Sequence, residues 1–391
     1  MEGWGVSLSF IPETGGYRGS KSVSKRSPKE APIMGLLRQD RMTSDERIIA
    51  LMNRRPTDRI PFGYRIFTGF SALNTGYTVY DMFTDMKKCF DAMTRTADMY
   101  GWQMTPMLPA PAITAWTFGG EVKWPSSPFA QSPMVTRYPV ITEEDAWNLK
   151  MPDVRTAGMI PQWMELGRLT VKSGAKFISF RADGPFDAAA QLCGVEQFCR
   201  WMMRKPQVAH RLLRLVTDFD IEFLRYWMDT FGLEHCNLFF IGAPTTSNQI
   251  ISPKFFQAFA LPYIKELHER VLAMGVKHIM CHICGEQNLN LPYWAQIPMG
   301  DPGILSFGHE VDQETASKYF PNDVICGNIE PAVIQTGTPE QVYELARRCI
   351  EKGRKHRAGF MLAPGCELPP KAPPYNVWMM MKAINDFGWY E

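Results

Sequence analysis

The sequence lacks the features that would direct a protein to a membrane or to a polyanion. No uninterrupted apolar run reaches the roughly 18 residues that a helix needs to cross a bilayer, and the N-terminus has no continuous apolar segment of the secretory type. Lys and Arg (42) nearly cancel Asp and Glu (40), which leaves a formal charge of +2. A balanced charge gives no general basis for attraction to nucleic acid or to an anionic membrane. We therefore expect neither as a partner, and we expect recognition to depend on local groups.

Cysteine is also not concentrated as it is in small secreted proteins. Nine cysteines are scattered over 391 residues, which is typical of a reducing compartment, and the sequence predicts a cytoplasmic protein. Apolar residue types make up 45% of the chain and charged types 21%, a composition that excludes global disorder. The 24 Met and 11 Trp suit either a roomy apolar cavity or ordinary core packing.

The first 40 residues differ in character from the rest of the chain. They are rich in Gly, Ser and Lys and show no sustained apolar periodicity, so we predict a flexible basic tail over 1–40. The fold is predicted to begin at Thr43-Ser44-Asp45-Glu46, which has the pattern of a helix capping box. Residues 41–391 are expected to form a single catalytic domain.

Short β-type runs alternate with helical patterns through this domain. Helix starts are predicted at Ser252-Pro253, for a helix running to Gly275, and at Thr338-Pro339, for a helix stopping at Gly353. Eight strands alternating with helices specify a parallel sheet, and eight is the number that closes a (β/α)8 TIM barrel. The predicted strands are 61–67, 102–107, 177–182, 236–241, 277–283, 304–308, 323–326 and 359–363.

Two segments interrupt this alternation. The stretch 108–140 is too rich in proline and aromatic residues for a regular helix, and we predict an excursion over one barrel mouth. The stretch 285–302 links one strand to the next. Both could act as lids, and both could equally be surface cover without a function.

Three residues at predicted strand ends have the chemistry of a metal site. Side chains alternate along 277–284, so His282 and Cys284 share a face while Cys281 and Ile283 take the other. Cys366 follows the last strand and lies within reach across a closed barrel mouth. One imidazole and two thiolates suit Zn²⁺ with an open fourth position, as in catalytic sites. Two alternatives stay open for the pattern alone: apolar filler cysteines, and a redox pair formed by Cys281 and Cys284.

Motifs along the domain resemble, in order, those of the uroporphyrinogen decarboxylase superfamily. Within it, His282-x-Cys284 with the distant Cys366 resembles the zinc motif of the corrinoid-dependent methyltransferases, the branch of the methylcobamide:coenzyme M methyltransferases. The motifs are Arg55-Pro56-Thr57-Asp58-Arg59-Ile60-Pro61, Asp183-Gly184-Pro185-Phe186, Ile251-Ser252-Pro253-Lys254-Phe255-Phe256, Leu261-Pro262-Tyr263, His282-Ile283-Cys284-Gly285, Gly327-Asn328-Ile329-Glu330-Pro331 and Ala363-Pro364-Gly365-Cys366.

This resemblance implies a zinc enzyme that moves a methyl group between a substrate and the cobalt of a corrinoid. The corrinoid, a methylcobamide, would be carried by a small partner protein that docks at the barrel mouth. The substrate would be a methylated O, N or S compound or an acceptor thiol. Two alternatives remain, a decarboxylase of tetrapyrrole precursors and a non-enzymatic corrinoid- or tetrapyrrole-binding relative. The Arg-Gln-Ala-Gly-Arg-Tyr signature with which the decarboxylases grip their substrate is absent from this sequence, which disfavours the first.

Further polar residues follow predicted strands on the expected catalytic face. We predict catalytic roles for His309, Glu310 and Asp183, with Glu310 or Asp183 as candidates for the fourth zinc position. Asn328 and Gly365 are predicted to contribute to cofactor binding. Hydrogen bonds that brace loops are the alternative for Asp183 and Asn328, and a solvated loop position is the alternative for His309.

Overall fold

The computed structural model describes residues 38–63, 67–102, 105–108, 111–127, 132–176, 178 and 180–390. Asp40–Glu391 form one compact unit. The predicted basic tail, 1–40, lies almost entirely outside the described residues.

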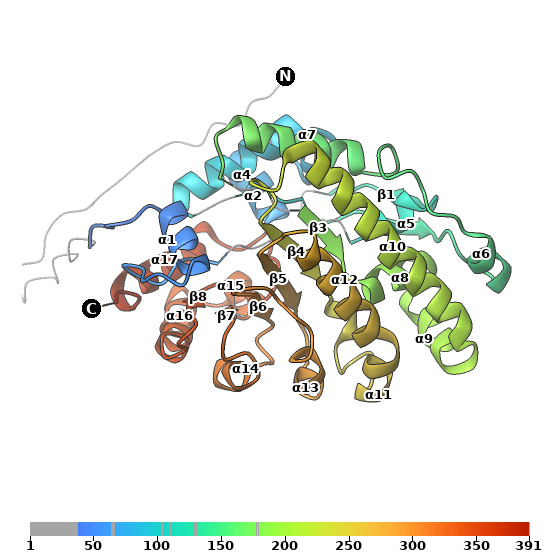
Figure 1. Ribbon diagram of the computed structural model, residues 1–391. Helices are drawn as coiled ribbons and strands as arrows, with labels where there is room; N and C mark the ends of the chain where they lie inside the picture. Colours follow the sequence, from blue (N-terminus) through green and yellow to red (C-terminus); the bar gives the residue numbers. More distant parts are fainter. Residues whose placement is uncertain are drawn as a thin grey trace, which may run out of the picture. The chain divides into compact units, whose positions relative to one another are not determined.

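The centre of the unit is a six-stranded parallel sheet whose strands follow one another in chain order (Figure 1). Each strand is short and almost wholly buried, as expected where helices cover a parallel sheet. The strands are β3 (Phe180–Asp183), β4 (Leu238–Gly242), β5 (His278–Ile283), β6 (Ile304–Phe307), β7 (Val324–Cys326) and β8 (Phe360–Met361).

These six strands confirm the last six strand predictions to within a few residues, whereas the first two differ. In the segment 61–67, a parallel bridge joins Phe62 to Leu362 beside β8, and residues 64–66 lie outside the described residues. The strand predicted at 102–107 is wrong for its described residues, 102 and 105–107, to which no strand is assigned. Met107 instead packs with Leu238, Phe240 and Met280 of the central strands in a buried cluster, and Trp102 stacks on Phe62 with ring centroids 4.7 Å apart.

Helices surround this sheet (Figure 1). Before β3 the chain forms α1 (Ser44–Met52), α2 (Thr68–Thr75), α3 (Val79–Thr84), α4 (Met86–Tyr100), α5 (Ile113–Thr117), α6 (Glu143–Asn148) and α7 (Ile160–Lys172). Between β3 and β5 it forms α8 (Pro185–Cys193), α9 (Val195–Arg204), α10 (Pro206–Phe231), the 3-10 turn η1 (Pro244–Thr246), α11 (Pro253–Phe255), the π-helical turn η2 (Phe256–Ala260) and α12 (Leu261–Ala273). The remaining helices are α13 (Leu291–Trp294), α14 (Gln313–Tyr319), α15 (Pro331–Thr336), α16 (Pro339–Gly353) and α17 (Pro374–Phe387).

The predicted helix signals have the expected structural roles, with one difference. Thr43 and Thr338 both form capping boxes, which start α1 and α16. The helix predicted from Ser252 to Gly275 is interrupted by the π-helical turn before α12. Pro262, at the start of α12, has no N–H to donate to the preceding turn, which explains why the regular hydrogen-bond ladder breaks here.

The excursion at 108–140 also contains regular structure. Besides α5, it forms a two-stranded antiparallel ribbon of β1 (Glu121–Lys123) and β2 (Met134–Arg137), and residues 109–110 and 128–131 lie outside the described residues. The ribbon is separate from the central sheet.

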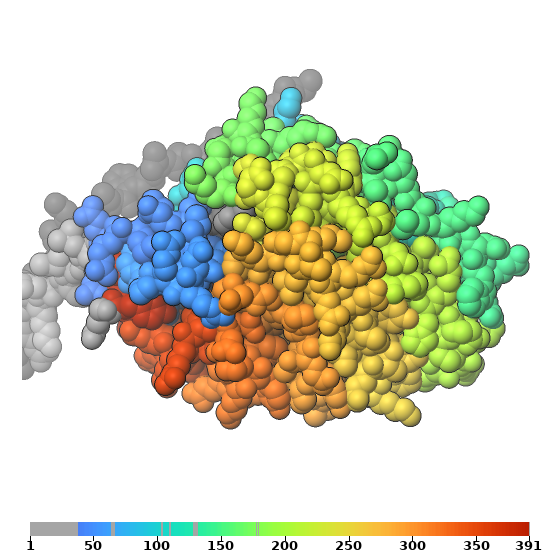
Figure 2. Space-filling model, viewed as in Figure 1, coloured from blue at the N-terminus to red at the C-terminus, as the bar shows by residue number. Residues whose placement is uncertain are grey.

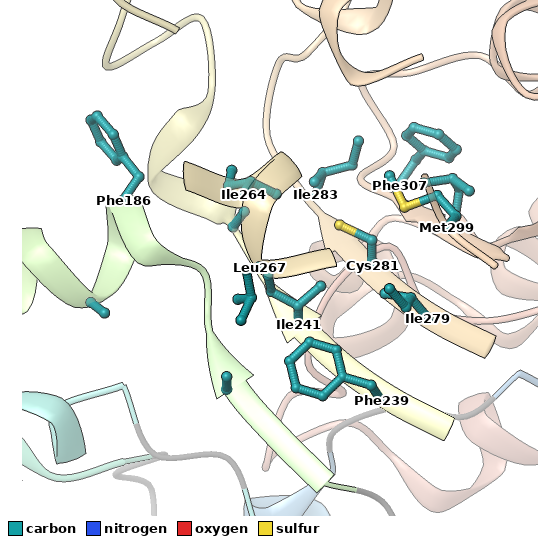
Figure 3. Close-up of a cluster of buried hydrophobic side chains, with 14 of the residues drawn as sticks. Phe186, Phe239, Ile241, Ile264, Leu267, Ile279, Cys281, Ile283, Met299 and Phe307 are labelled. Carbon is teal, nitrogen blue, oxygen red and sulfur yellow. The ribbon is translucent and has the colours of Figure 1, made fainter. Parts of the chain in front are cut away.

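Alternating side chains of β5 face two different environments, as the sequence predicts. Ile279, Cys281 and Ile283 pack into the main core, where Figure 3 shows them facing Ile264 and Leu267 of α12. Met280 belongs to a second buried cluster, which includes Leu238, Phe240 and Ile304 of the neighbouring strands. His282 therefore projects from the same face of the strand as Met280, away from the helical layer.

The long helices α10 and α12 form much of the cover over this part of the sheet. The yellow and gold side chains of the α10–α12 region fill the middle of the face shown in Figure 2. Within the described part of the chain, no helix has the length and apolar content needed to span a membrane.

Candidate metal centre and substrate cavity

The predicted ligands His282, Cys284 and Cys366 come together at the carboxyl end of the sheet. One nitrogen or sulfur atom of each lies within 4.8 Å of the others. His282 is the last residue of β5 on the face turned away from the helices. Cys284 follows that strand, and Cys366 follows β8. Residues 82 positions apart in the chain thus supply the two sulfurs. The remaining cysteines of the described residues take no part in this cluster.

Glycines allow the three loops that carry these ligands to approach closely. A Cβ atom at Gly308 would lie 2.9 Å from the amide nitrogen of Gly285 and 3.3 Å from the Cα atom of Cys284. A Cβ atom at Gly365 would lie 3.0 Å from the amide nitrogen of His309. A side chain at either position would therefore push apart the loops after β5, β6 and β8, and the two sulfurs with them.

The separation of the two sulfurs fits a shared metal ion. The Sγ atoms of Cys284 and Cys366 are 3.7 Å apart. A disulfide would require about 2.05 Å. Two sulfurs bound to one tetrahedral zinc, with Zn–S bonds of about 2.3 Å, would stand about 3.8 Å apart. The donor set of one imidazole and two thiolates is also one that zinc prefers, so the residues present fit this ion.

The two thiols affect each other's protonation. Their hydrogen bond lowers the pKa of Cys366 and raises that of Cys284, because a thiolate on one sulfur is stabilised by the proton that its neighbour keeps. His282 lowers the pKa of Cys366 further. The lowered pKa of Cys366 favours its thiolate, the form that binds metals.

The imidazole ring of His282 is held by a buried partner. Its Nδ1 atom lies 2.8 Å from the hydroxyl oxygen of Ser306, which belongs to β6, and both residues are buried. This contact fixes the ring orientation. Such a contact is typical of metal-binding histidines, whose second nitrogen is held by a neighbouring polar group.

A cavity of about 520 Å³ opens beside the three ligands. Residues of the 108–140 excursion form one wall, which supports the prediction that this segment covers a mouth of the sheet. Polar groups come from β3, α8 and the loop after β8. Among the lining residues are Pro133, Met134, Val135, Tyr138, Arg181, Asp183, Asp187, Gln191, Phe240, Pro244, Thr245 and Glu367.

Asp183, one of the predicted catalytic residues, lines this cavity but is already fully hydrogen-bonded. One carboxylate oxygen accepts from Arg181 at 2.7 Å. The other accepts from Gln191 at 2.7 Å and from the Thr114 hydroxyl at 3.0 Å. These contacts fix the end of β3 against α5 and α8, and they favour the bracing interpretation of Asp183.

Two cavity carboxyl groups were not predicted from the sequence. Asp187 in α8 is 6% exposed and accepts a hydrogen bond from the Thr245 N–H at 3.0 Å through Oδ1, while its buried Oδ2 atom has no hydrogen-bond partner. Oε1 of Glu367, next to Cys366, is likewise buried without a partner. Burial raises the pKa of Asp187 to about 7, against the opposing effect of Thr245, and raises that of Glu367 to about 8. A signal existed for Asp187, which is a charged residue in the otherwise apolar run 185–190.

His309 and Glu310 lie in the loop after β6, close to the three candidate ligands. The His309 side chain is 44% exposed, and its Nδ1 atom is 3.6 Å from a carboxylate oxygen of Glu310. That oxygen, Oε2, is buried and has no hydrogen-bond partner. Neither residue belongs to the three-ligand cluster itself.

The two residues predicted to bind a cofactor have structural contacts of their own. The Asn328 amide donates to the carbonyl groups of Gly308 and Val311 at 2.8 and 2.7 Å, and its oxygen accepts from Gln313 at 3.2 Å. These bonds brace the loop after β6 and favour the bracing interpretation. The contribution of Gly365 is the close backbone approach described above.

The parallel sheet, with polar ligands gathered at the carboxyl ends of its strands, defines a class of α/β enzyme folds. The chain belongs to the uroporphyrinogen decarboxylase (URO-D) family, whose model matches residues 43–387. That match includes all the central strands and every candidate site residue.

Curated relatives of this chain include methyltransferases and decarboxylases. It is 24% identical over 355 residues to methylcobamide:CoM methyltransferase MtbA of Methanosarcina acetivorans, an alignment that covers 88% of this chain and 98% of the relative. It is 31% identical over 207 residues to a methylated-thiol–coenzyme M methyltransferase of Methanosarcina mazei, covering 48% and 52%. A uroporphyrinogen decarboxylase of Nocardia farcinica is 29% identical over 192 residues, covering 47% and 50%.

A solved structure shares the fold. A methyltransferase from Methanosarcina mazei superposes with a TM-score of 0.75 at 20% sequence identity, covering 88% of this chain and 99% of the other. At this identity the likeness concerns the fold alone.

Proposed function

We propose that this protein is a zinc-dependent methyltransferase that moves a methyl group between a small substrate and the cobalt of a corrinoid carried by a partner protein. The observation that carries the proposal is the convergence of His282, Cys284 and Cys366 beside a cavity. Support also comes from the methyltransferases among the relatives, one of which aligns over nearly its whole length.

His282, Cys284 and Cys366 would hold the zinc, and Ser306 would orient the imidazole. Zinc held by one imidazole and two thiolates supplies a Lewis acid without net charge, which lowers the pKa of an acceptor thiol or polarises a methylated heteroatom. Glu310 is the better of the two candidates for a fourth ligand, because its buried Oε2 atom has no partner while both oxygens of Asp183 are engaged.

The other residues of the cavity would bind and orient the substrate. The apolar wall formed by the 108–140 excursion excludes water from one side of the cavity. His309, exposed at the rim, would donate a proton to a leaving alkoxide when the methyl donor is a methoxy compound. The corrinoid protein would dock at this end of the sheet, where the cavity opens.

The same proposal includes a closed (β/α)8 barrel. The bridge between Phe62 and Leu362 lies at the edge of β8, where a first strand must pair if the sheet closes. The 61–67 segment would lie next to β8 in this ring.

The test is methyl transfer from methylcobalamin to a panel of thiols and tetrahydrofolate, and to cob(I)alamin from methoxy-arenes and methylamines, followed by the cobalamin absorbance. We expect transfer with one of these classes and its loss in Cys284→Ala. Cys199→Ala, which alters a half-buried cysteine of α9 outside the cluster, is the matched control and should behave like the wild type. Turnover of uroporphyrinogen that is unaffected by Cys284→Ala would contradict the proposal and favour a decarboxylase.

A further inference from the structure

The cavity beside the candidate metal centre contains more buried acid than buried base. Asp183, Asp187 and Glu367 line it, and among its described lining residues Arg181 is the single lysine or arginine. Arg181 forms an ion pair with Asp183, with an N–O distance of 2.7 Å and side chains 11% and 9% exposed, while its buried Nε atom has no hydrogen-bond partner. Asp187 and Glu367 each keep one buried oxygen without a hydrogen-bond partner. Buried polar atoms are rarely left in this state, so a ligand that donates to them or carries positive charge is indicated.

The rest of the lining is apolar and partly aromatic. Tyr138 and Phe240 supply ring surfaces, while Met134, Val135 and Pro244 supply aliphatic surface. A cationic group surrounded by methyl substituents suits such a lining, because it needs apolar contacts around its periphery and one counter-ion rather than many hydrogen bonds.

We propose that Asp187 is the counter-ion for a methylated ammonium group of the substrate, which binds in this cavity beside the sulfurs of Cys284 and Cys366. This rests on the proposed function and narrows its substrate to methylated amines. An anionic thiol, such as one bearing a sulfonate, would meet the carboxyl groups of Asp187 and Glu367, and Arg181, whose charge is shared with Asp183, would be the single lysine or arginine of the described lining to oppose them.

The position of Asp187 in the fold supports this role. It lies in the first turn of α8, directly after the end of β3, so both a helix and a strand fix its backbone. The Thr245 N–H holds Oδ1 and so sets the direction of Oδ2. The carboxyl group is therefore placed in advance, which reduces the entropic cost of binding a cation.

The test compares choline with its uncharged isostere 3,3-dimethyl-1-butanol by calorimetric titration of the zinc-loaded protein. A charge-assisted contact of this type is worth about 1.5–3 kcal/mol, which corresponds to a preference of roughly ten- to a hundredfold. We expect the wild type to prefer choline by at least about tenfold. Asp187→Asn should reduce the preference to less than about threefold, while its zinc content stays the same.

Two further variants separate charge from shape and from surface effects. Asp187→Glu keeps the charge and should retain most of the preference. Glu165→Gln makes the same chemical change as Asp187→Asn on the exposed face of α7 and should bind like the wild type. Equal affinity of the wild type for the two probes would overturn the proposal. So would loss of zinc in Asp187→Asn, which would make Asp187 a metal ligand, or tighter binding of 2-mercaptoethanesulfonate than of choline.

The binding test and the function test fail in different ways. A choline preference without methyl transfer from or to cobalamin would leave the cation site standing and overturn the methyltransferase proposal. Methyl transfer to an anionic thiol, without a choline preference, would support the methyltransferase proposal and overturn the cation site.

Discussion

Two buried aspartates at opposite ends of the sheet differ in how many hydrogen-bond donors surround their carboxyl groups. Asp58, near the amino end of β8, accepts two hydrogen bonds from Arg47, at 2.6 and 2.9 Å, and others from the backbone N–H groups of Arg41, Met42 and Arg59. Asp187, beyond the carboxyl end of β3, has Thr245 as its hydrogen-bonding neighbour and one oxygen without a partner.

The pKa values of the two groups move in opposite directions. Burial alone would raise the pKa of Asp58, but Arg47 and the backbone donors lower it to about 2. Burial raises the pKa of Asp187 to about 7, because Thr245 compensates it only in part. Asp58 therefore stabilises the fold, and it lies within a motif that carries the family resemblance. Asp187 costs stability, which is typical of groups retained for binding or catalysis.

The largest change in the free energy of unfolding is expected for Asp58. Asp58→Asn removes the buried counter-charge of the Arg47 guanidinium and leaves it the half-exposed Asp40 at 3.5 Å, so we expect a loss of about 3–5 kcal/mol in the free energy of unfolding. Urea denaturation measures it. Glu351→Gln removes a partner of Arg347 on the exposed face of α16 and should cost at most about 1 kcal/mol. Equal losses in the two variants would show that the buried Arg47–Asp58 pair stabilises the fold no more than an exposed ion pair does.

Asp187→Asn is expected to change the free energy of unfolding in the opposite direction, by stabilising the protein. Since the pKa of Asp187 rises on folding, the stability of the metal-free wild type is fully present below about pH 4, the unfolded pKa, and falls as pH rises to about 7. Asp187→Asn removes this loss. We expect the variant to match the wild type at pH 4 and to exceed it by about 1–3 kcal/mol at pH 8.

Denaturation of both proteins across this pH range, in the presence of a chelator, is the measurement. A variant that is less stable than the wild type at pH 8 would mean that Asp187, like Asp58, stabilises the fold.

The smallest effect is expected at Ser306, which holds the ring of His282. Ser306→Ala should weaken zinc binding about tenfold, or about 1.4 kcal/mol, because the imidazole loses its fixed orientation. Competition with a chromogenic chelator measures the affinity. Ser306→Thr keeps the hydroxyl group and should restore most of it. Unchanged affinity in Ser306→Ala would exclude an orienting role.

The sequence predicts the buried part of the sheet well because the physical signal is local. Parallel strands covered on both sides appear as short apolar runs, and the alternation along 277–284 correctly places His282 on one face and Cys281 on the other. The prediction at 102–107 is wrong because apolar residues that pack against the side chains of a sheet, such as Met107, have the same local pattern as residues that join its hydrogen-bond ladder.

The candidate site is predictable where residue type alone indicates chemistry. Imidazole and thiol groups at strand ends indicate His282, Cys284 and Cys366, and the family resemblance supports the same three residues. The importance of Asp187 and Glu367 depends instead on which donors surround a buried oxygen, a property of the folded chain. For the same reason the hydrogen bonds that occupy Asp183 and Asn328 become visible only in the structure.

The central claim is that His282, Cys284 and Cys366 hold one zinc ion. Metal analysis of the protein purified without chelator, combined with X-ray absorption at the zinc edge, tests it most directly. We predict about one zinc per chain, bound to two sulfurs at about 2.3 Å and to lighter atoms, and its loss in Cys366→Ser but not in Cys199→Ala. A metal-free wild type, or a Cys366→Ser variant that keeps its zinc with unchanged sulfur coordination, would contradict the account.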